Sequence, residues 1–225
     1  MRLRADFSQR AAVLPDEYEW VPSPAPGVER MMLDRVGEEV ARATSIVRYA
    51  PNSRFPAHEH GGGEEILVLD GEFGDEHGRY PAGCYLRNPI GTRHSPRIGS
   101  EGATIFVKLH QFAANDTAQL AIDSDKGGWI PGRIDGVEIQ PLHRHGDENV
   151  FLMRWAPDTA YPEHVHPGGE EILVLDGAYH DEDGHYPTGS WVRYPDGSRH
   201  RPFTLAEGAL LFVKEGHLPS DRIRQ

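Results

Sequence analysis

Cysteine is almost absent from this sequence, since Cys84 is the only one among 225 residues. No disulfide can therefore form within the chain, as is usual for proteins of reducing compartments. Long apolar runs are also missing, and none approaches the roughly 20 residues that span a bilayer. The N-terminal stretch MRLRADFSQR lacks the apolar core of a signal peptide. Together these absences predict a cytoplasmic protein without a membrane partner.

Positive charge is scarce as well. The chain has 23 Lys and Arg against 35 Asp and Glu, which gives a formal net charge of −12. Such a surface repels phosphate backbones and anionic lipid, so we expect no nucleic-acid partner.

Uninterrupted helical stretches are the third absence, because 25 glycines and 18 prolines punctuate the chain. What remains between them are short apolar runs that end in Ala-Pro or Asp-Gly turn signals. Many short strands with turns between them predict an all-β sandwich or barrel. The clearest runs are Ser45–Tyr49, Ile66–Leu69 and Ile105–Val107, with their later counterparts Val150–Trp155, Ile172–Leu175 and Leu210–Val213.

The chain contains an internal repeat. HEHGGGEEILVLDG from His58 to Gly71 returns as HVHPGGEEILVLDG from His164, an offset of 164 − 58 = 106 residues. A repeat of this length is a duplicated domain rather than a solenoid unit. The predicted boundaries are an N-terminal tail or peripheral strand at 1–19, a first domain at 20–112, a linker with one short strand at 113–128, and a second domain at 129–219.

Each copy carries a pattern typical of metal ligands. On a strand, residues i and i+2 share a face, so His58 and His60 can aim two imidazoles at one point. A Glu-Glu pair and a third histidine, His94, follow in the first copy, and the same set recurs 106 residues later. Imidazole and carboxylate together suit divalent Zn, Fe, Mn, Ni or Cu. Six-coordinate metals would keep positions for water, O2 or substrate, whereas tetrahedral zinc would be closed by four ligands.

These residues resemble the two motifs of the cupin superfamily, G-x5-H-x-H-x3,4-E-x6-G and G-x5-P-x-G-x2-H. The leading glycine of the first motif is replaced by Asn52 and Asp158, which tolerate turn conformations. The six-residue gap to the closing glycine selects the first glutamate of each pair, so Glu65 and Glu171 are expected to be solvated or supporting carboxylates. The resemblance thus implies one divalent metal in each copy, held by His58, His60, Glu64 and His94 in the first and by His164, His166, Glu170 and His200 in the second.

Within the superfamily, the closest similarity is to the ChrR cupin-like group, through H-x-H-x3-E-E-I-L-V-L-D-G, the Y-P-x-G run and the preceding W-x-P segment. It implies two tandem jelly-roll (double-stranded β-helix) barrels and either a homodimer or a pseudo-dimeric monomer.

The group contains two functional types. One is the cupin half of anti-sigma factors, and the other is a dioxygenase that cleaves small β-diketones. We place a stress- or ligand-sensing regulatory protein first and a mononuclear metal dioxygenase second, with a small molecule as ligand or substrate. The residues before Trp20 contain no Cys or His. The sigma-binding zinc motif H-x3-C-x2-C of such anti-sigma factors is thus not found there, which argues against direct sigma-factor binding.

Several other residues have simpler interpretations. We expect Cys84 to fill a small buried slot, Trp20 and Trp129 to plug barrel ends, and the H-x-H pair beginning at His143 to be solvated. In the second motif, either Tyr85 or its neighbour should face the barrel interior, and parity alone leaves both possible.

Overall fold

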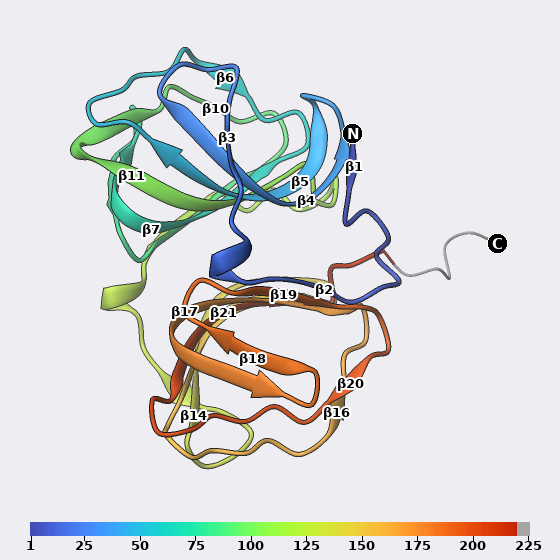
Figure 1. Ribbon diagram of the computed structural model, residues 1–225. Coiled ribbons are helices and arrows are strands. Elements are labelled where there is room, and N and C mark those ends of the chain that lie inside the picture. The colour runs from blue at the N-terminus through green and yellow to red at the C-terminus, as the bar shows by residue number, and fades with distance from the viewer. Residues whose placement is uncertain (220–225) are drawn as a thin grey trace. The chain divides into compact units, whose positions relative to one another are not determined.

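The computed structural model describes residues 1–219, which fold into two compact all-β units (Figure 1). One unit comprises Met1–Ala5 and Glu19–Gly127, and the other comprises Asp6–Tyr18 and the residues from Gly128. The predicted all-β fold with two tandem barrels is confirmed. No helix within residues 1–219 is long and apolar enough to cross a bilayer.

The first unit contains a nine-stranded sheet, ordered β1-β4-β5-β11-β7-β9-β12, and a two-stranded β6-β10 ladder. Strands β3 and β8 extend the large sheet by pairing with β4 and β7. Its elements are β1 (Arg2–Leu3), β3 (Trp20–Pro22), β4 (Val28–Gly37), β5 (Ala41–Tyr49), β6 (His58–Glu59), β7 (Glu64–Gly74), β8 (Arg79–Pro81), β9 (Cys84–Asn88), β10 (Arg93–His94), β11 (Arg97–Leu109), β12 (Leu120–Asp123) and the 3₁₀ turn η2 (Ser124–Lys126).

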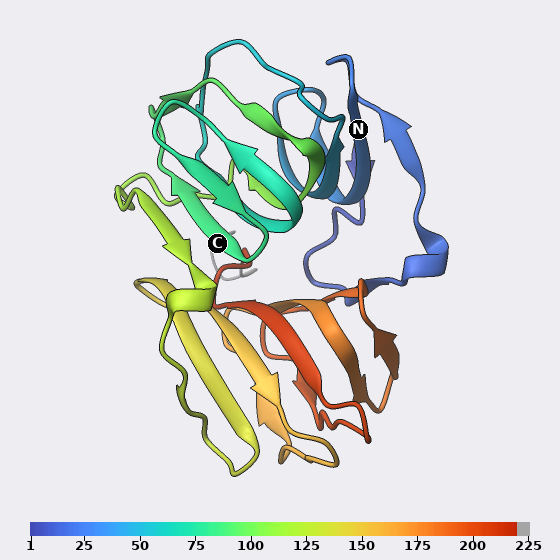
Figure 2. The same ribbon diagram turned by 90° about the vertical axis from the view of Figure 1, so that its left-hand side faces the viewer.

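The second unit repeats this plan, with an eight-stranded sheet ordered β13-β14-β15-β21-β17-β19-β2, in which β18 pairs with β17, and a β16-β20 ladder. In Figure 2, β14, β15 and β21 lie side by side in yellow to red, in agreement with their register. The elements are β2 (Ala11–Val13), the 3₁₀ turn η1 (Pro15–Glu17), β13 (Ile130–Pro131), β14 (Val137–His145), β15 (Glu148–Trp155), β16 (His164–Val165), β17 (Glu170–Asp181), β18 (Gly184–Pro187), β19 (Trp191–Tyr194), β20 (Arg199–His200) and β21 (Ala209–Glu215).

Turn residues explain where the strands bend. Asn52 and Asp158 have φ of 57° and 53°, so the two residues that replace the motif glycine adopt the left-handed conformation expected of a glycine. Gly71 also has a positive φ, of 70°, and a Cβ there would collide with the carbonyl oxygen of Gly102. The closing glycine of the motif is therefore required both by backbone conformation and by space.

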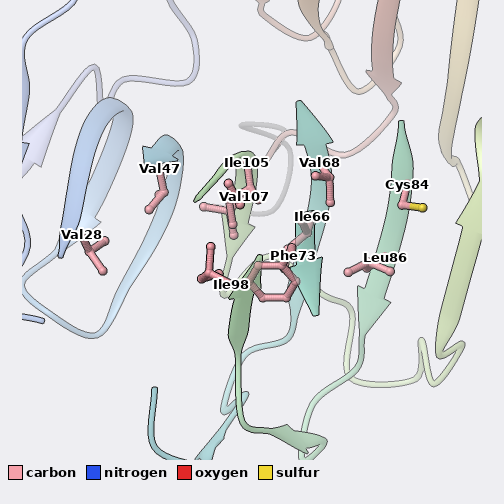
Figure 3. Packing of buried hydrophobic residues seen from close by; sticks show 11 residues of the cluster. Val28, Val47, Ile66, Val68, Phe73, Cys84, Leu86, Ile98, Ile105 and Val107 are labelled. Carbon is pink, nitrogen blue, oxygen red and sulfur yellow. The ribbon is translucent and has the colours of Figure 1, made fainter. Parts of the chain in front are cut away.

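Each barrel is filled by its own apolar core. In the first, Ile66, Val68, Phe73, Ile105 and other apolar side chains from different strands converge (Figure 3). Complete burial of side chains of this size contributes about 1.5–3 kcal/mol each. The second core has the same construction, with Ile172, Val174, Tyr179 and Leu211 among its members.

The parity left open by the sequence is settled by this packing. Leu86 belongs to the core of the first barrel, whereas Tyr85 points to the other face and donates a hydrogen bond to Glu65 (2.5 Å). Val192 and Trp191 repeat this division in the second barrel, where Trp191 Nε1 donates to Glu171 (2.7 Å).

A short strand that precedes one of the repeated tryptophans completes each large sheet. Strand β12, which precedes Trp129, pairs with β9 of the first barrel through Leu120↔Arg87 to Asp123↔Cys84. Strand β2, which precedes Trp20, pairs with β19 of the second barrel (Figure 1).

Candidate metal centres

The first centre lies where the β6-β10 ladder meets the start of β7. His58 pairs directly with His94 across the ladder, which brings their ring centroids to 4.8 Å. His60 follows two residues after His58, and its ring lies 4.6 Å from that of His94. Glu64 is the first residue of β7, and its Oε2 lies 3.2 Å from His60 Nε2 and 3.5 Å from His94 Nε2.

The four side chains have the geometry of a ligand set. One donor atom from each of His58, His60, Glu64 and His94 lies within 4.8 Å of all the others. Donors 2.0–2.2 Å from a common ion are separated by about 3–4.4 Å, so only small adjustments would be needed. Nε2 of His60 and of His94 are buried and have no hydrogen-bond partner among residues 1–219. Because orphaned buried nitrogens are costly, these two atoms fit a role as donors to a cation.

The outer ring nitrogens in the first barrel are engaged by neighbours. His60 Nδ1 lies 2.9 Å from Thr92 Oγ1, and His94 Nδ1 lies 3.3 Å from Asp75 Oδ2. These contacts orient the rings and direct Nε2 inward, as is usual behind metal-binding histidines. Burial lowers the pKa of His60. Burial also acts to lower the pKa of His94, but the hydrogen bond to Asp75 and the charge of Glu64 outweigh it and leave that pKa raised.

The second centre is built by β16, β20 and the start of β17. His164 pairs with His200 across the ladder. His200 Nε2 lies 2.9 Å from His166 Nε2 and 3.3 Å from His164 Nε2. Three imidazole nitrogens this close require either a proton or a cation between them.

Glu170 is held less firmly than Glu64. Its Oε2 lies 3.6 Å from His166 Nε2 and 3.8 Å from His200 Nε2, and it has no hydrogen-bond partner in the described part of the chain. The four predicted residues of this barrel do not fall into one group. Instead, His164, His166 and His200 form one set of close donors, and His166, Glu170 and Glu215 form another. Burial, followed by the charges of Glu215 and Asp181, raises the pKa of Glu170 to about 8.

A cavity of about 680 Å³ opens onto the second centre. This volume lies within the range typical of small-molecule sites. Its apolar walls include Val137, Phe151 and Trp155, and its polar groups include Tyr179, Arg133 and Glu215 besides the predicted ligands. Tyr179 Oη lies 3.2 Å from His200 Nδ1. The arrangement can hold a small organic molecule beside a bound cation.

Sequence reasoning missed Glu215 and Arg133 as site residues. The signal was present in the repeat, because Glu215 stands where the first copy has Leu109 and Arg133 where it has Pro24. In both cases the second copy places a charged residue where the first has an apolar one.

Three expectations require correction. Of the two roles expected for Glu65 and Glu171, solvated or supporting, the solvated one is wrong. Both are only 2% exposed, because Glu65 pairs with Arg87 (3.2 Å) and Glu171 with His217 (3.0 Å) on the sheet face away from the core. His143 is half-buried and lines the cavity instead of being solvated.

The third correction concerns the tryptophans. Trp20 and Trp129 are half-buried and are not among the residues that pack on the apolar cores. They stack instead with Arg48 and Arg154, whose guanidinium carbons lie 3.8 and 4.5 Å from the ring centroids. Cys84, by contrast, lies buried in the first core as expected, and burial raises the pKa of its thiol.

Known structures share this fold. A "putative dioxygenase" from Nostoc punctiforme superposes with a TM-score of 0.74 at 20% identity, covering 95% of this chain and 79% of that one. Protein Ylba from E. coli has a TM-score of 0.71 at 14% identity, with 96% and 94% covered. An oxalate decarboxylase from Lactobacillus farciminis, solved as a formate complex, has a TM-score of 0.65 at 11% identity, with 93% and 87% covered. At these identities the likeness establishes the fold alone.

Comparison with curated protein sequences gives no significant match. The family model described as the ChrR cupin-like domain, however, matches residues 8–113 and again residues 117–219. These two segments cover nearly the whole sequence and coincide with the two copies of the repeat. The chain is therefore a bicupin that belongs to the ChrR cupin-like family.

Proposed function

We propose that this protein is a metal-dependent enzyme with its active site in the second barrel, and that it is a dioxygenase acting on a small β-dicarbonyl compound or a related acid. The observation that carries the proposal is the cavity of about 680 Å³ that opens onto His164, His166, Glu170 and His200. The sequence alone favoured a sensing role. A ligand set that meets a cavity of substrate size favours catalysis, because a reaction needs both a metal and a dry place beside it.

The donor set fits a divalent transition metal. Counted without Glu215, three neutral imidazoles and the Glu170 carboxylate leave a net charge near +1 on a divalent ion, and a six-coordinate ion keeps positions for exogenous molecules. A redox-active metal bound there would supply oxygen activation and polarisation of a carbonyl group.

The protein groups around the cavity supply substrate binding. The walls formed by Val137, Phe151 and Trp155 exclude water and pack against a carbon skeleton. Arg133 lines the same cavity, beside the hydroxyl of Tyr161. Burial raises the pKa of Tyr161, while Arg133 opposes that rise. A guanidinium at this place suits an enolate or carboxylate oxygen.

The test is oxygen consumption by protein reconstituted with Fe(II), measured over a panel of β-diketones and β-keto acids. We expect uptake that depends on substrate, that is lost in His200→Ala and that is retained in the matched first-barrel variant His94→Ala. Loss of uptake in His94→Ala alone would place the reaction in the first barrel and contradict the proposed location of the active site. No uptake with any substrate would overturn the enzymatic proposal.

The second candidate is a regulatory metal protein that senses a ligand. It is favoured by the family match, since the matching domain is that of ChrR. On this alternative the cavity binds a signal molecule. Absence of oxygen uptake together with tightly held zinc would support it.

A further inference from the structure

The second barrel carries a carboxylate that the first barrel lacks. Glu215 lies on β21 directly opposite Glu170 of β17 in the sheet register. In the first barrel the same register position pairs Leu109 with Glu64. The two barrels therefore differ by one negative charge immediately beside the glutamate of the centre.

Two directly opposed carboxylates on one sheet face repel each other and destabilise the sheet. Here the repulsion is strengthened by burial, because Glu170 is only 7% exposed and Glu215 is half-buried. Asn149 donates a hydrogen bond of 3.1 Å to Glu215 and holds its side chain in this position. The repulsion is removed when a proton or a cation lies between the two carboxylates, and only a cation leaves both of them ionised.

The neighbouring donors indicate where that charge belongs. Donor atoms of His166, Glu170 and Glu215 lie within 4.8 Å of one another, and His166 is shared with the three-histidine set. Glu170 Oε2 is buried without a hydrogen-bond partner among residues 1–219 and faces His166 and His200. A cation bound by the histidines would therefore lie next to both carboxylates.

We propose that the Glu215 carboxylate belongs to the second centre, in addition to His164, His166, Glu170 and His200. Its negative charge makes this centre bind divalent cations more tightly than the first. With two carboxylates, the second set neutralises a divalent ion fully and has the more oxygen-rich donors, which favour hard ions such as Mn²⁺. The first set, with Glu64 alone, leaves a net charge near +1. The inference shares with the proposed function only the premise that the second barrel binds a metal.

The experiment measures Mn²⁺ binding to the full chain by the electron paramagnetic resonance signal of the free ion. His60→Ala/His94→Ala protein isolates the second centre, and His166→Ala/His200→Ala protein isolates the first. In His60→Ala/His94→Ala protein, Glu215→Leu installs the residue of the other barrel, and Glu215→Gln removes the charge with little change in shape. In His166→Ala/His200→Ala protein, Leu109→Glu is the reciprocal change.

We expect the second centre to bind Mn²⁺ roughly tenfold or more tightly than the first, and both Glu215 variants to lose that advantage. Leu109→Glu should strengthen the first centre, while Glu207→Gln, an exposed carboxylate of the second barrel, should change nothing. If Glu215→Leu does not fold, Glu215→Gln decides. Equal affinity in Glu215→Gln and its background overturns the inference, and so does absence of Mn²⁺ binding at the second centre. An affinity difference without oxygenase activity would leave the inference standing and remove the proposed function.

Discussion

The side-chain amide of Asn88 donates a hydrogen bond of 3.1 Å to Oε2 of Glu64. The two residues are cross-strand neighbours on β9 and β7. In the second barrel Tyr194 stands opposite Glu170, and its hydroxyl donates to Asp181 instead. The carboxylate of the first centre is thus oriented in advance, whereas that of the second centre is not.

Removal of this support should weaken only the first centre. We expect Asn88→Ala to lower its metal affinity by about 10–100-fold, the usual effect of losing a group that orients a ligand. Competition dialysis against a chelator of known affinity measures the effect, and the second centre of the same protein is the control. Unchanged affinity at the first centre would contradict the prediction.

The two centres should also load independently, since each ligand set is complete within one barrel. His58→Ala is expected to remove about one metal equivalent and leave the site at His164, His166 and His200 filled. Metal analysis of the purified protein tests this, with the exposed His77→Ala as the matched control. Loss of both metals would mean that the centres are coupled.

The raised pKa of Glu170 makes the stability of the metal-free protein depend on pH. Its pKa is about 8 in the folded state against an ordinary value near 4.5, so the folded state binds the extra proton. The stability that the protonated form of Glu170 gives the folded state is fully present below pH ~4.5, and it is lost as the pH rises to about 8.

Glu170→Gln should therefore be more stable than wild type in chelator-treated protein at pH 8.5, and the difference should shrink at pH 5. Thermal unfolding at both pH values measures it. Comparison of the two proteins at each pH cancels the titration of the histidines. A difference that does not vary with pH would show that Glu170 titrates normally.

Gly71 allows steric collision to be separated from backbone strain. Gly71→Ala should cost more than Gly91→Ala, because both glycines have positive φ but a Cβ at Gly91 meets nothing within 4 Å. Left-handed strain alone costs about 1 kcal/mol, and the collision with Gly102 should add at least as much. Urea unfolding compares the two, and equal losses would contradict the argument.

Sequence periodicity and motif spacing predicted the fold and the approximate position of both centres. The H-x-H alternation predicts that His58 and His60 point to one site, because residues i and i+2 of a strand share a face. The 106-residue offset repeats the same set, including the counterpart of His94, in the second copy. The same logic left Glu65 and Glu171 either solvated or supporting, and it could not exclude solvation, since it does not show that these strands are buried on both faces. Glu215 could be seen only as a difference from Leu109, and its position opposite Glu170 depends on a pairing between distant strands.

Strands β2 and β12, which complete the two large sheets, bear on how the duplicated chain arose and on how it would respond to cleavage. Each precedes the tryptophan that opens one copy of the repeat, yet each is hydrogen-bonded into the sheet of the other copy. This is the pattern left when two identical chains with exchanged N-terminal arms become fused head to tail. Scission between Gly127 and Gly128 would not release two finished domains. It would leave β2 without its sheet on one fragment and an open edge at β19 on the other, so the separated halves should recombine or aggregate.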